Sequence, residues 1–144
     1  MYTGYELSEE SRNKLKKIFP PKYPMFLGHH ITEKFGESDP DNIPEQPEKA
    51  KVVGYVNDKK GIEGLLVSIN GTTNRPDGSQ YHITWSLDNS KGYKPVHTNK
   101  IISKAVSIKP INIEVTPKFF SNSTTQELKK KTLKDHVNGL TNIL

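Results

Sequence analysis

The most regular hydrophobic pattern in the chain is an alternation over residues 80–87. Successive side chains of a β-strand point to opposite faces, so the alternation predicts a strand with one face suited to burial and the other to polar contacts. The first face carries Tyr81, Ile83, Trp85 and Leu87, and the second carries Gln80, His82, Thr84 and Ser86.

A triplet of this strand, in which one isoleucine separates a histidine from a threonine, also occurs earlier in the chain. His30, Ile31 and Thr32 lie in a second predicted strand, residues 25–35, which Gly36 closes. In both copies the imidazole and the hydroxyl project to one side of the strand and the isoleucine to the other. Two such strands are a more specific signal than a single triplet.

The N-terminal part of the chain predicts one helix. Ser8 is suited to cap it, and its inward stripe is formed by Leu15, Ile18 and Phe19 before two prolines end it. Residues 37–49 have no hydrophobic pattern and are rich in Asp, Glu, Pro, Asn and Gln, so they predict a surface connection.

The remaining hydrophobic runs predict further strands. Residues 51–57 and 62–70 are rich in Val, Ile and Leu and predict an antiparallel hairpin. Residues 75–78 have the composition of a turn, residues 101–108 fit either a helical or an extended start, and residues 111–115 predict the last strand. A polar linker is expected beyond Pro117, and then a basic helix or tail that docks on the domain, pairs two subunits or stays disordered.

Composition narrows the choice of function classes. The 144 residues correspond most simply to one domain, and the absence of cysteine excludes disulfides and thiolate nucleophiles. The net charge of +5 favours a phosphate-bearing partner, although charge alone fits a basic surface equally well. The sequence lacks a secretory leader pattern and a long apolar run, so we expect a cytoplasmic protein without membrane contact.

Two imidazoles and two hydroxyls are a set of groups that suits phosphoryl chemistry. One histidine takes a proton from a nucleophile while the other gives a proton to the leaving oxygen. The threonine hydroxyls donate to the non-bridging phosphate oxygens, where charge is held during transfer. This scheme requires neither a metal nor another cofactor.

The paired triplets resemble the signature of the 2H phosphoesterase superfamily, which is two copies of His-x-Thr/Ser followed by a hydrophobic residue. Trp85 follows the second triplet as the signature expects, whereas Glu33 follows the first. Residues 19–24, ahead of the first triplet, also resemble small phage and tRNA-ligase-like members. The resemblance covers roughly residues 2–102.

The resemblance implies a compact α+β fold with two pseudo-symmetric lobes whose antiparallel strands surround a central groove. Residues 1–117 would form this domain, and residues 118–144 the linker and C-terminal tail. We expect a monomer, or a weak homo-oligomer that pairs through this tail. His30 and His82 would be the acid/base pair, and Thr32 and Thr84 the substrate-binding hydroxyls.

The implied activity is metal-independent cleavage of a phosphodiester. RNA ends with a 2',3'-cyclic phosphate, 2'-5' linkages, cyclic oligonucleotides and ADP-ribose cyclic phosphates all present the same phosphoryl centre. The resemblance also includes phage proteins that degrade an immune nucleotide signal of the CBASS type. A phage protein with this activity, in the host cytoplasm, is therefore one of the expected functions.

Other interpretations involve the same residues. A nucleotide-sequestering module or a basic RNA-binding domain would keep the strands without catalysis, and zinc would need His29, His30, His82 or His97 as ligands. His29 faces away from its neighbour His30, so we expect it to be packed or hydrogen-bonded behind the strand. Three further groups are weaker candidates for contact with a substrate. Arg75 and Lys91 would supply positive charge beside the second triplet, and His97, Asn99 and Lys100 would form a turn or the rim of the groove. Tyr5, Tyr81 and Trp85 could stack on a base, but the alternation favours the core for them.

Overall fold

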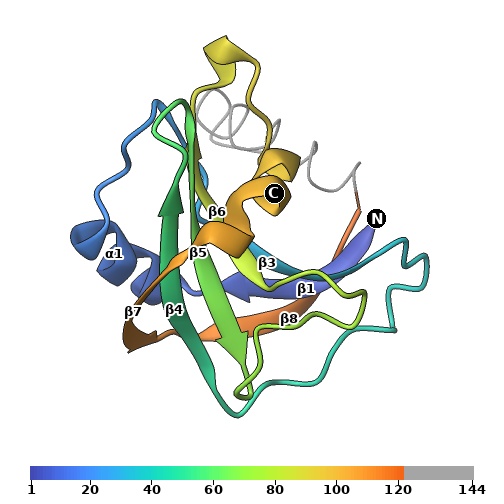
Figure 1. Cartoon of the computed structure of the whole chain (residues 1–144). Coiled ribbons are helices and arrows are strands. Elements are labelled where there is room, and N and C mark those ends of the chain that lie inside the picture. The colour runs from blue at the N-terminus through green and yellow to red at the C-terminus, as the bar shows by residue number, and fades with distance from the viewer. Residues whose placement is uncertain (122–144) are drawn as a thin grey trace, which may run out of the picture.

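Two antiparallel β-sheets, accompanied by few helices, make up the fold in the computed structural model, which describes residues 1–121 (Figure 1). The α+β class is therefore confirmed. The smaller sheet has the strand order β3-β1-β8, formed by β1 (Tyr2–Leu7), β3 (His30–Phe35) and β8 (Val115–Phe120). The larger has the order β2-β6-β5-β4-β7, formed by β2 (Met25–Phe26), β4 (Ala50–Asn57), β5 (Ile62–Ile69), β6 (His82–Leu87) and β7 (Val106–Asn112).

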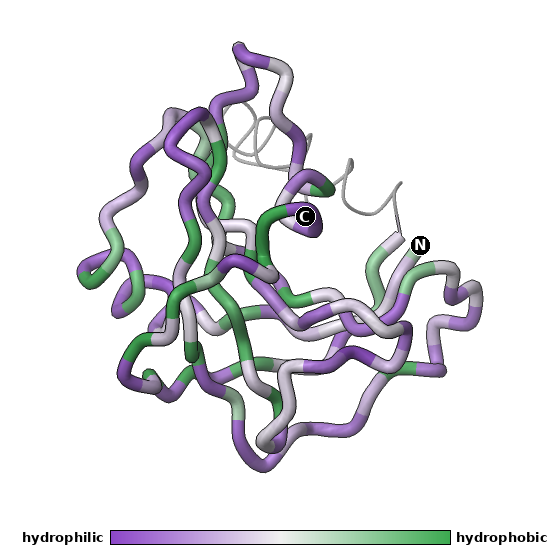
Figure 2. The backbone as a smooth tube through the Cα atoms, viewed as in Figure 1, coloured by the Kyte–Doolittle hydropathy of each residue, from purple (hydrophilic) through white to green (hydrophobic). Residues whose placement is uncertain are grey.

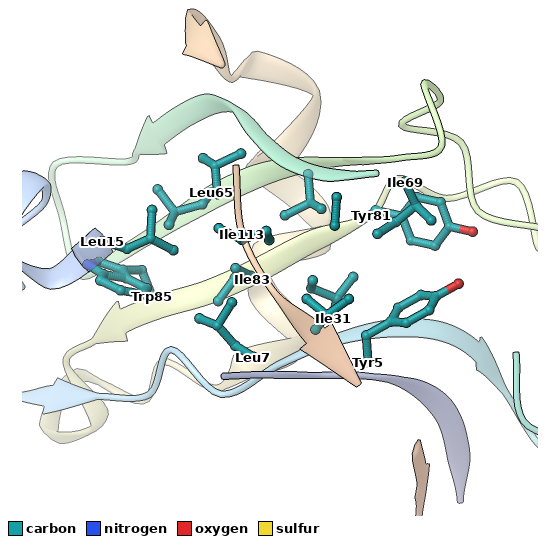
Figure 3. Close-up of a cluster of buried hydrophobic side chains, with 14 residues drawn as sticks. Tyr5, Leu7, Leu15, Ile31, Leu65, Ile69, Tyr81, Ile83, Trp85 and Ile113 are labelled. Carbon is teal, nitrogen blue, oxygen red and sulfur yellow. The ribbon is translucent and has the colours of Figure 1, made fainter. Parts of the chain in front are cut away.

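The hydrophobic core lies between the two sheets. Figure 3 shows Leu7 and Ile31 of the smaller sheet pointing toward Ile83 of the larger one, and all three side chains are buried. Trp85 is fully buried nearby, and its indole N–H donates to the carbonyl of Phe19 at 2.8 Å. Figure 2 shows hydrophobic stretches along the central strands and hydrophilic hairpin tips. The predicted buried face of residues 80–87 is confirmed.

The predicted helix is present as α1 (Glu9–Ile18), and Ser8 caps it by accepting a hydrogen bond from the Ser11 amide at 3.0 Å. Leu15 is fully buried against the core, and Phe19 stacks on Tyr55 with ring centroids 5.4 Å apart. Ile18 is 49% exposed, so its place in the inward stripe was wrongly predicted. Within residues 1–121, no helix combines the length and the apolar character needed to span a membrane.

The second group of helical turns lies between β6 and β7. It consists of η1 (Asn89–Lys91), η2 (Pro95–His97), α2 (Thr98–Ile101) and η3 (Ile102–Lys104). The segment around residues 101–108 thus starts helical and continues as β7. The predicted hairpin is confirmed as β4 and β5, and the turn at residues 75–78 is closed by the Gly78 amide donating to the Arg75 carbonyl at 3.0 Å.

Two strand predictions are wrong in their boundaries. The single strand expected over residues 25–35 is divided into β2 and β3, which belong to different sheets. The last strand is β8, not residues 111–115, and it includes Pro117 and runs to Phe120 where a linker was expected. Proline is compatible with this position because β8 is the edge strand of its sheet. The predicted tail beyond residue 121 lies outside the described residues.

A buried carboxylate holds the segment before β2 against β6. Glu63 of β5 is fully buried and accepts hydrogen bonds from the Tyr55 hydroxyl, the Ser86 hydroxyl and, at 2.7 Å, the Lys22 amide. The Tyr23 amide donates to the Ser86 hydroxyl at 3.2 Å. Because a buried polar group without a partner is costly, these bonds fix the path of the chain into β2.

We predict that Ser86→Ala destabilises the protein by about 1–3 kcal/mol, because it removes a donor to a buried carboxylate. Urea unfolding followed by circular dichroism measures the free energy of unfolding. Ser103→Ala is the matched control, since Ser103 is exposed, and its free energy of unfolding should stay close to that of the wild type. Equal stability of the two variants would contradict a structural role for the Glu63 network.

Candidate active site

The first His-x-Thr triplet is carried from one sheet to the other at Gly28. Before this residue the chain pairs with β6: Phe26 is in register with Ser86, and the Gly28 amide donates to the Thr84 carbonyl at 3.1 Å. After it the chain pairs with β1, beginning with the His29 carbonyl, which accepts from Leu7 at 2.8 Å. The chain therefore bridges the two sheets directly ahead of β3.

Gly28 suits this change of direction for two reasons. Its φ of +61° lies in the left-handed region, which non-glycine residues adopt at a cost. A Cβ atom at this position would lie 2.8 Å from the Trp85 ring and 2.9 Å from the Phe26 ring. The crossover thus needs a residue without a side chain.

Arg12 of α1 holds the crossover in place. Its Nη2 donates to the Leu27 carbonyl at 2.8 Å and its Nε to the Gly28 carbonyl at 3.1 Å. The guanidinium carbon also lies 4.2 Å from the centroid of the Phe26 ring, within the range of a cation–π contact. Sequence reasoning missed Arg12, since nothing in the helix pattern links it to a segment more than ten residues away.

The crossover places the two histidines on neighbouring strands. β3 lies beside β6 although the two strands belong to different sheets, and His82 is close enough to His30 for its charge to lower the pKa of His30. Ile31 and Ile83, each next to one of these histidines, point into the core and are fully buried. Because side chains alternate along a strand, both histidines project from the other side of their strands.

The imidazole of His30 is held in a partly buried, aromatic environment. Its ring centroid lies 5.4 Å from that of Tyr2 and 5.3 Å from that of Phe120, and its Nε2 is 3.3 Å from the Tyr2 hydroxyl. Burial, followed by the charges of His29 and His82, lowers the pKa of His30 from 6.5 to about 4. His30 is therefore neutral at pH 7 and able to accept a proton.

His82 is 8% exposed and has one nitrogen fixed by the backbone. Its Nδ1 lies 2.8 Å from the Gln80 carbonyl, which only accepts, so Nδ1 carries the proton. Burial lowers the pKa of His82, the bond to Gln80 raises it, and the positive charge of Arg75 lowers it. The tautomer leaves Nε2 as the nitrogen that exchanges a proton with a bound molecule.

The two threonines differ in their surroundings. The Thr84 hydroxyl lies 2.8 Å from the Thr98 hydroxyl and 3.3 Å from the Pro95 carbonyl. Thr98 is fully buried on α2, and a Cβ on Gly64 would lie 2.8 Å from its methyl group, so α2 packs closely on the strand beside β6. Within the described part of the chain, the Thr32 hydroxyl has no hydrogen-bond partner. Thr98 carried no sequence signal that set it apart from its polar neighbours.

Because His82 and Ser86 are buried, the face of β6 expected to be polar and open is largely covered. Glu63 satisfies Ser86, and the helical segment after η2 covers Thr84. Of the four residues of this face, Gln80 and Thr84 remain partly exposed.

The other residues singled out by sequence fall into distinct groups. Arg75 is 4% exposed, pairs with Asp77 and is close enough to His82 to affect its pKa. Lys91 instead lies in η1, beside the tip of the β4–β5 hairpin, where it donates to the Lys60 carbonyl at 3.3 Å. His29 is exposed, so of the two expectations for it, packing behind the strand is wrong, while a hydrogen bond there stays a prediction.

The remaining candidates have structural roles. His97 accepts from the Lys94 amide at 3.0 Å through Nδ1, and the Asn99 side chain donates to the Val96 carbonyl at 3.1 Å, as expected for a turn. Lys100 is exposed on α2. The core assignment is confirmed for all three aromatic candidates, Tyr5, Tyr81 and Trp85.

Neither of two surface hollows contains the histidine pair. One, of about 500 Å³, is lined by residues that include Ser8, Glu48 and Glu114. The other, of about 360 Å³, is lined by residues that include Tyr93 and His97. Among residues 1–121, no group of three or more His, Asp or Glu side chains is arranged to hold a metal ion.

Comparison with family models, curated proteins and solved structures finds no match for this chain. The chemistry of the site is therefore inferred from the side chains themselves.

We predict that Gly28→Ala destabilises the protein more than Gly71→Ala does. Gly71 also has a positive φ, +88°, but a Cβ there would meet no atom within 4 Å. The Gly71 variant thus isolates the conformational cost, about 1–2 kcal/mol, whereas the Gly28 variant adds a clash with Trp85 and Phe26. Urea unfolding of both variants measures the difference, and equal losses would show that the crossover tolerates a side chain.

Proposed function

We propose that the protein is a metal-independent phosphodiesterase that acts on a nucleotide or RNA phosphodiester by acid/base catalysis with two histidines. The observation that carries this proposal is the placement of His30 and His82 on neighbouring strands, each with a threonine two residues further along. In this proposal the fold is a compact version of the 2H phosphoesterase fold, with the two sheets as its lobes.

The difference between the two imidazoles supports an order of roles. The pKa of His30 is lowered strongly, to about 4, whereas the Gln80 carbonyl opposes the lowering at His82. When one proton is shared between the two rings, it therefore lies on His82. In the first step His30 accepts the proton of the attacking hydroxyl, and His82 gives its proton from Nε2 to the leaving oxygen.

The hydroxyls complete the phosphate site. The Thr32 hydroxyl donates a hydrogen bond to a non-bridging oxygen, since it has no internal partner among the described residues. The Thr84 hydroxyl is held by a hydrogen bond to the Thr98 hydroxyl, in which either oxygen can be the donor. A donor fixed before the substrate arrives, as the Thr84 hydroxyl is by Thr98, stabilises the charge of the transition state without reorganisation.

Substitution of either histidine tests the proposal. We predict that His30→Ala and His82→Ala each lower kcat about 10²–10⁴-fold, the usual contribution of a general acid or base. The assay is a hydrolysis panel with chelator present. Its substrates are RNA ends with a 2',3'-cyclic phosphate, 2'-5' oligoadenylate, cyclic di- and trinucleotides, and ADP-ribose cyclic phosphate.

His97→Ala is the matched control for this panel, because His97 lies in a turn and should leave turnover at the wild-type rate. Unchanged hydrolysis by both active-site variants would refute the mechanism. Tight retention of a nucleotide by the wild type without any product would instead identify a nucleotide-sequestering module.

The lowered pKa values predict an acidic optimum. Above the lowered pKa of His82 both imidazoles are neutral and the free protein lacks an acid, so kcat/KM should fall as the pH rises, with its maximum below pH 6.5. A bound phosphate anion favours the imidazolium form, so the falling limb of kcat should lie at higher pH than that of kcat/KM. Rates measured from pH 4 to 9 on the best substrate check both limbs, and a kcat/KM maximum above pH 7 would contradict the assignment.

A further inference from the structure

An aromatic cluster that the proposed chemistry does not use lies beside His30. Tyr2 stacks on Phe120, with ring centroids 4.9 Å apart and an angle of 15° between the rings, and it lies 5.6 Å from the ring of Phe35. The His30 ring is in contact with the same group through Tyr2 and Phe120. Two aromatic rings, Tyr2 and Phe120, thus flank one of the two candidate catalytic groups, and Phe35 lies next to Tyr2.

A β-bulge brings Phe35 to this cluster. Simple alternation from the buried Ile31 would turn Phe35 toward the core. The pairing of β1 with β3 shifts between Thr3 and Gly4, leaving Glu33 as the extra residue, and beyond the shift Phe35 pairs with Tyr2. Bulges commonly redirect a side chain near a functional site.

Phe35 is 54% exposed, which is unusual for a large aromatic side chain next to a polar site. Its ring lies 5.3 Å from the guanidinium carbon of Arg75. That guanidinium is almost fully buried, and its Nε has no hydrogen-bond partner among residues 1–121. The guanidinium of Arg75 holds the Phe35 ring from one side by a cation–π contact, and the opposite side of the ring is then the one that a ligand would contact.

We propose that Phe35 and Tyr2 form a platform on which a nucleobase of the substrate stacks while the phosphate lies between His30 and His82. This inference rests on the proposed function and adds to it that the substrate is recognised through a base as well as a phosphoryl group. Aromatic side chains stack on any base, because every base has a π-face, so the platform selects nucleotides over simple phosphodiesters.

The test is a set of binding titrations by calorimetry, which do not depend on turnover. The two probes are adenosine 2'-monophosphate and the base-free ribose 5-phosphate, each with the full-length protein. The wild type should bind the nucleotide about tenfold or more tightly than the base-free probe, the usual effect of one stacked base. Phe35→Leu should remove that preference and bind ribose 5-phosphate as the wild type does.

Two further variants separate stacking from other effects of the substitution. Phe35→Tyr keeps an aromatic ring and should keep the preference for the nucleotide. Val106→Ala alters another exposed hydrophobic side chain, 70% exposed on β7 at the far edge of the larger sheet, and should leave both affinities unchanged. Thermal unfolding of each variant confirms that the proteins compared are folded.

The outcomes distinguish this inference from the proposed function. Nucleotide binding that depends on Phe35, without any hydrolysis of the panel, supports the platform and refutes the phosphodiesterase. Hydrolysis with equal nucleotide affinity in the wild type and Phe35→Leu, or no preference of the wild type for the nucleotide, refutes the platform. A dimer in sedimentation that Phe35→Leu dissociates, with nucleotide affinity unchanged, would assign Phe35 to contact with a second copy and also overturn the inference.

Discussion

The change of partner that the chain makes at Gly28 is the constraint on which the rest of the candidate site depends. A single segment pairs first with β6 and then with β1, so the two sheets are joined covalently where the histidines lie. Arg12 fixes the carbonyls of this segment from α1, and the Glu63 network fixes its start. The positions of His30 and His82 therefore follow from backbone hydrogen bonds and not from flexible loops.

Burial then determines the electrostatics of the pair. Both imidazoles lie in surroundings that disfavour their charged forms, and each has a further positive or titrating neighbour that acts in the same direction. Only His82 has a carbonyl acceptor that opposes the effect. Two histidines in identical triplets are thereby given different surroundings, which is the condition for one to act as acid and the other as base.

Sequence predicted those features that depend on local pattern. The cap at Ser8, the central hairpin and the buried face that includes Trp85 follow from capping chemistry and alternation, and the structure confirms them. The strand boundaries at Gly28 and Pro117 were wrong for tertiary reasons. A positive φ at a glycine and an edge position for a proline are both set by neighbouring strands, which a single segment does not encode.

The residues that support the site were missed for the same reason. Arg12 and Thr98 act through segments distant in sequence, and the place of Phe35 depends on a bulge in its pairing with β1. The two triplets were visible because each is contiguous. Their proximity in space depends on register between strands.

Ile31 and Ile83, described above as core residues, give the fold a further property. Each is the immediate neighbour of a candidate catalytic histidine, and both are fully enclosed between the sheets. Since protein interiors are packed to near-crystalline density, a change of volume at either isoleucine displaces the strand that carries the neighbouring histidine. A methyl group gained or lost at Ile31 or Ile83 would therefore move the imidazole on the far side of the same strand, so that the volume of the core and the placement of the two histidines are coupled.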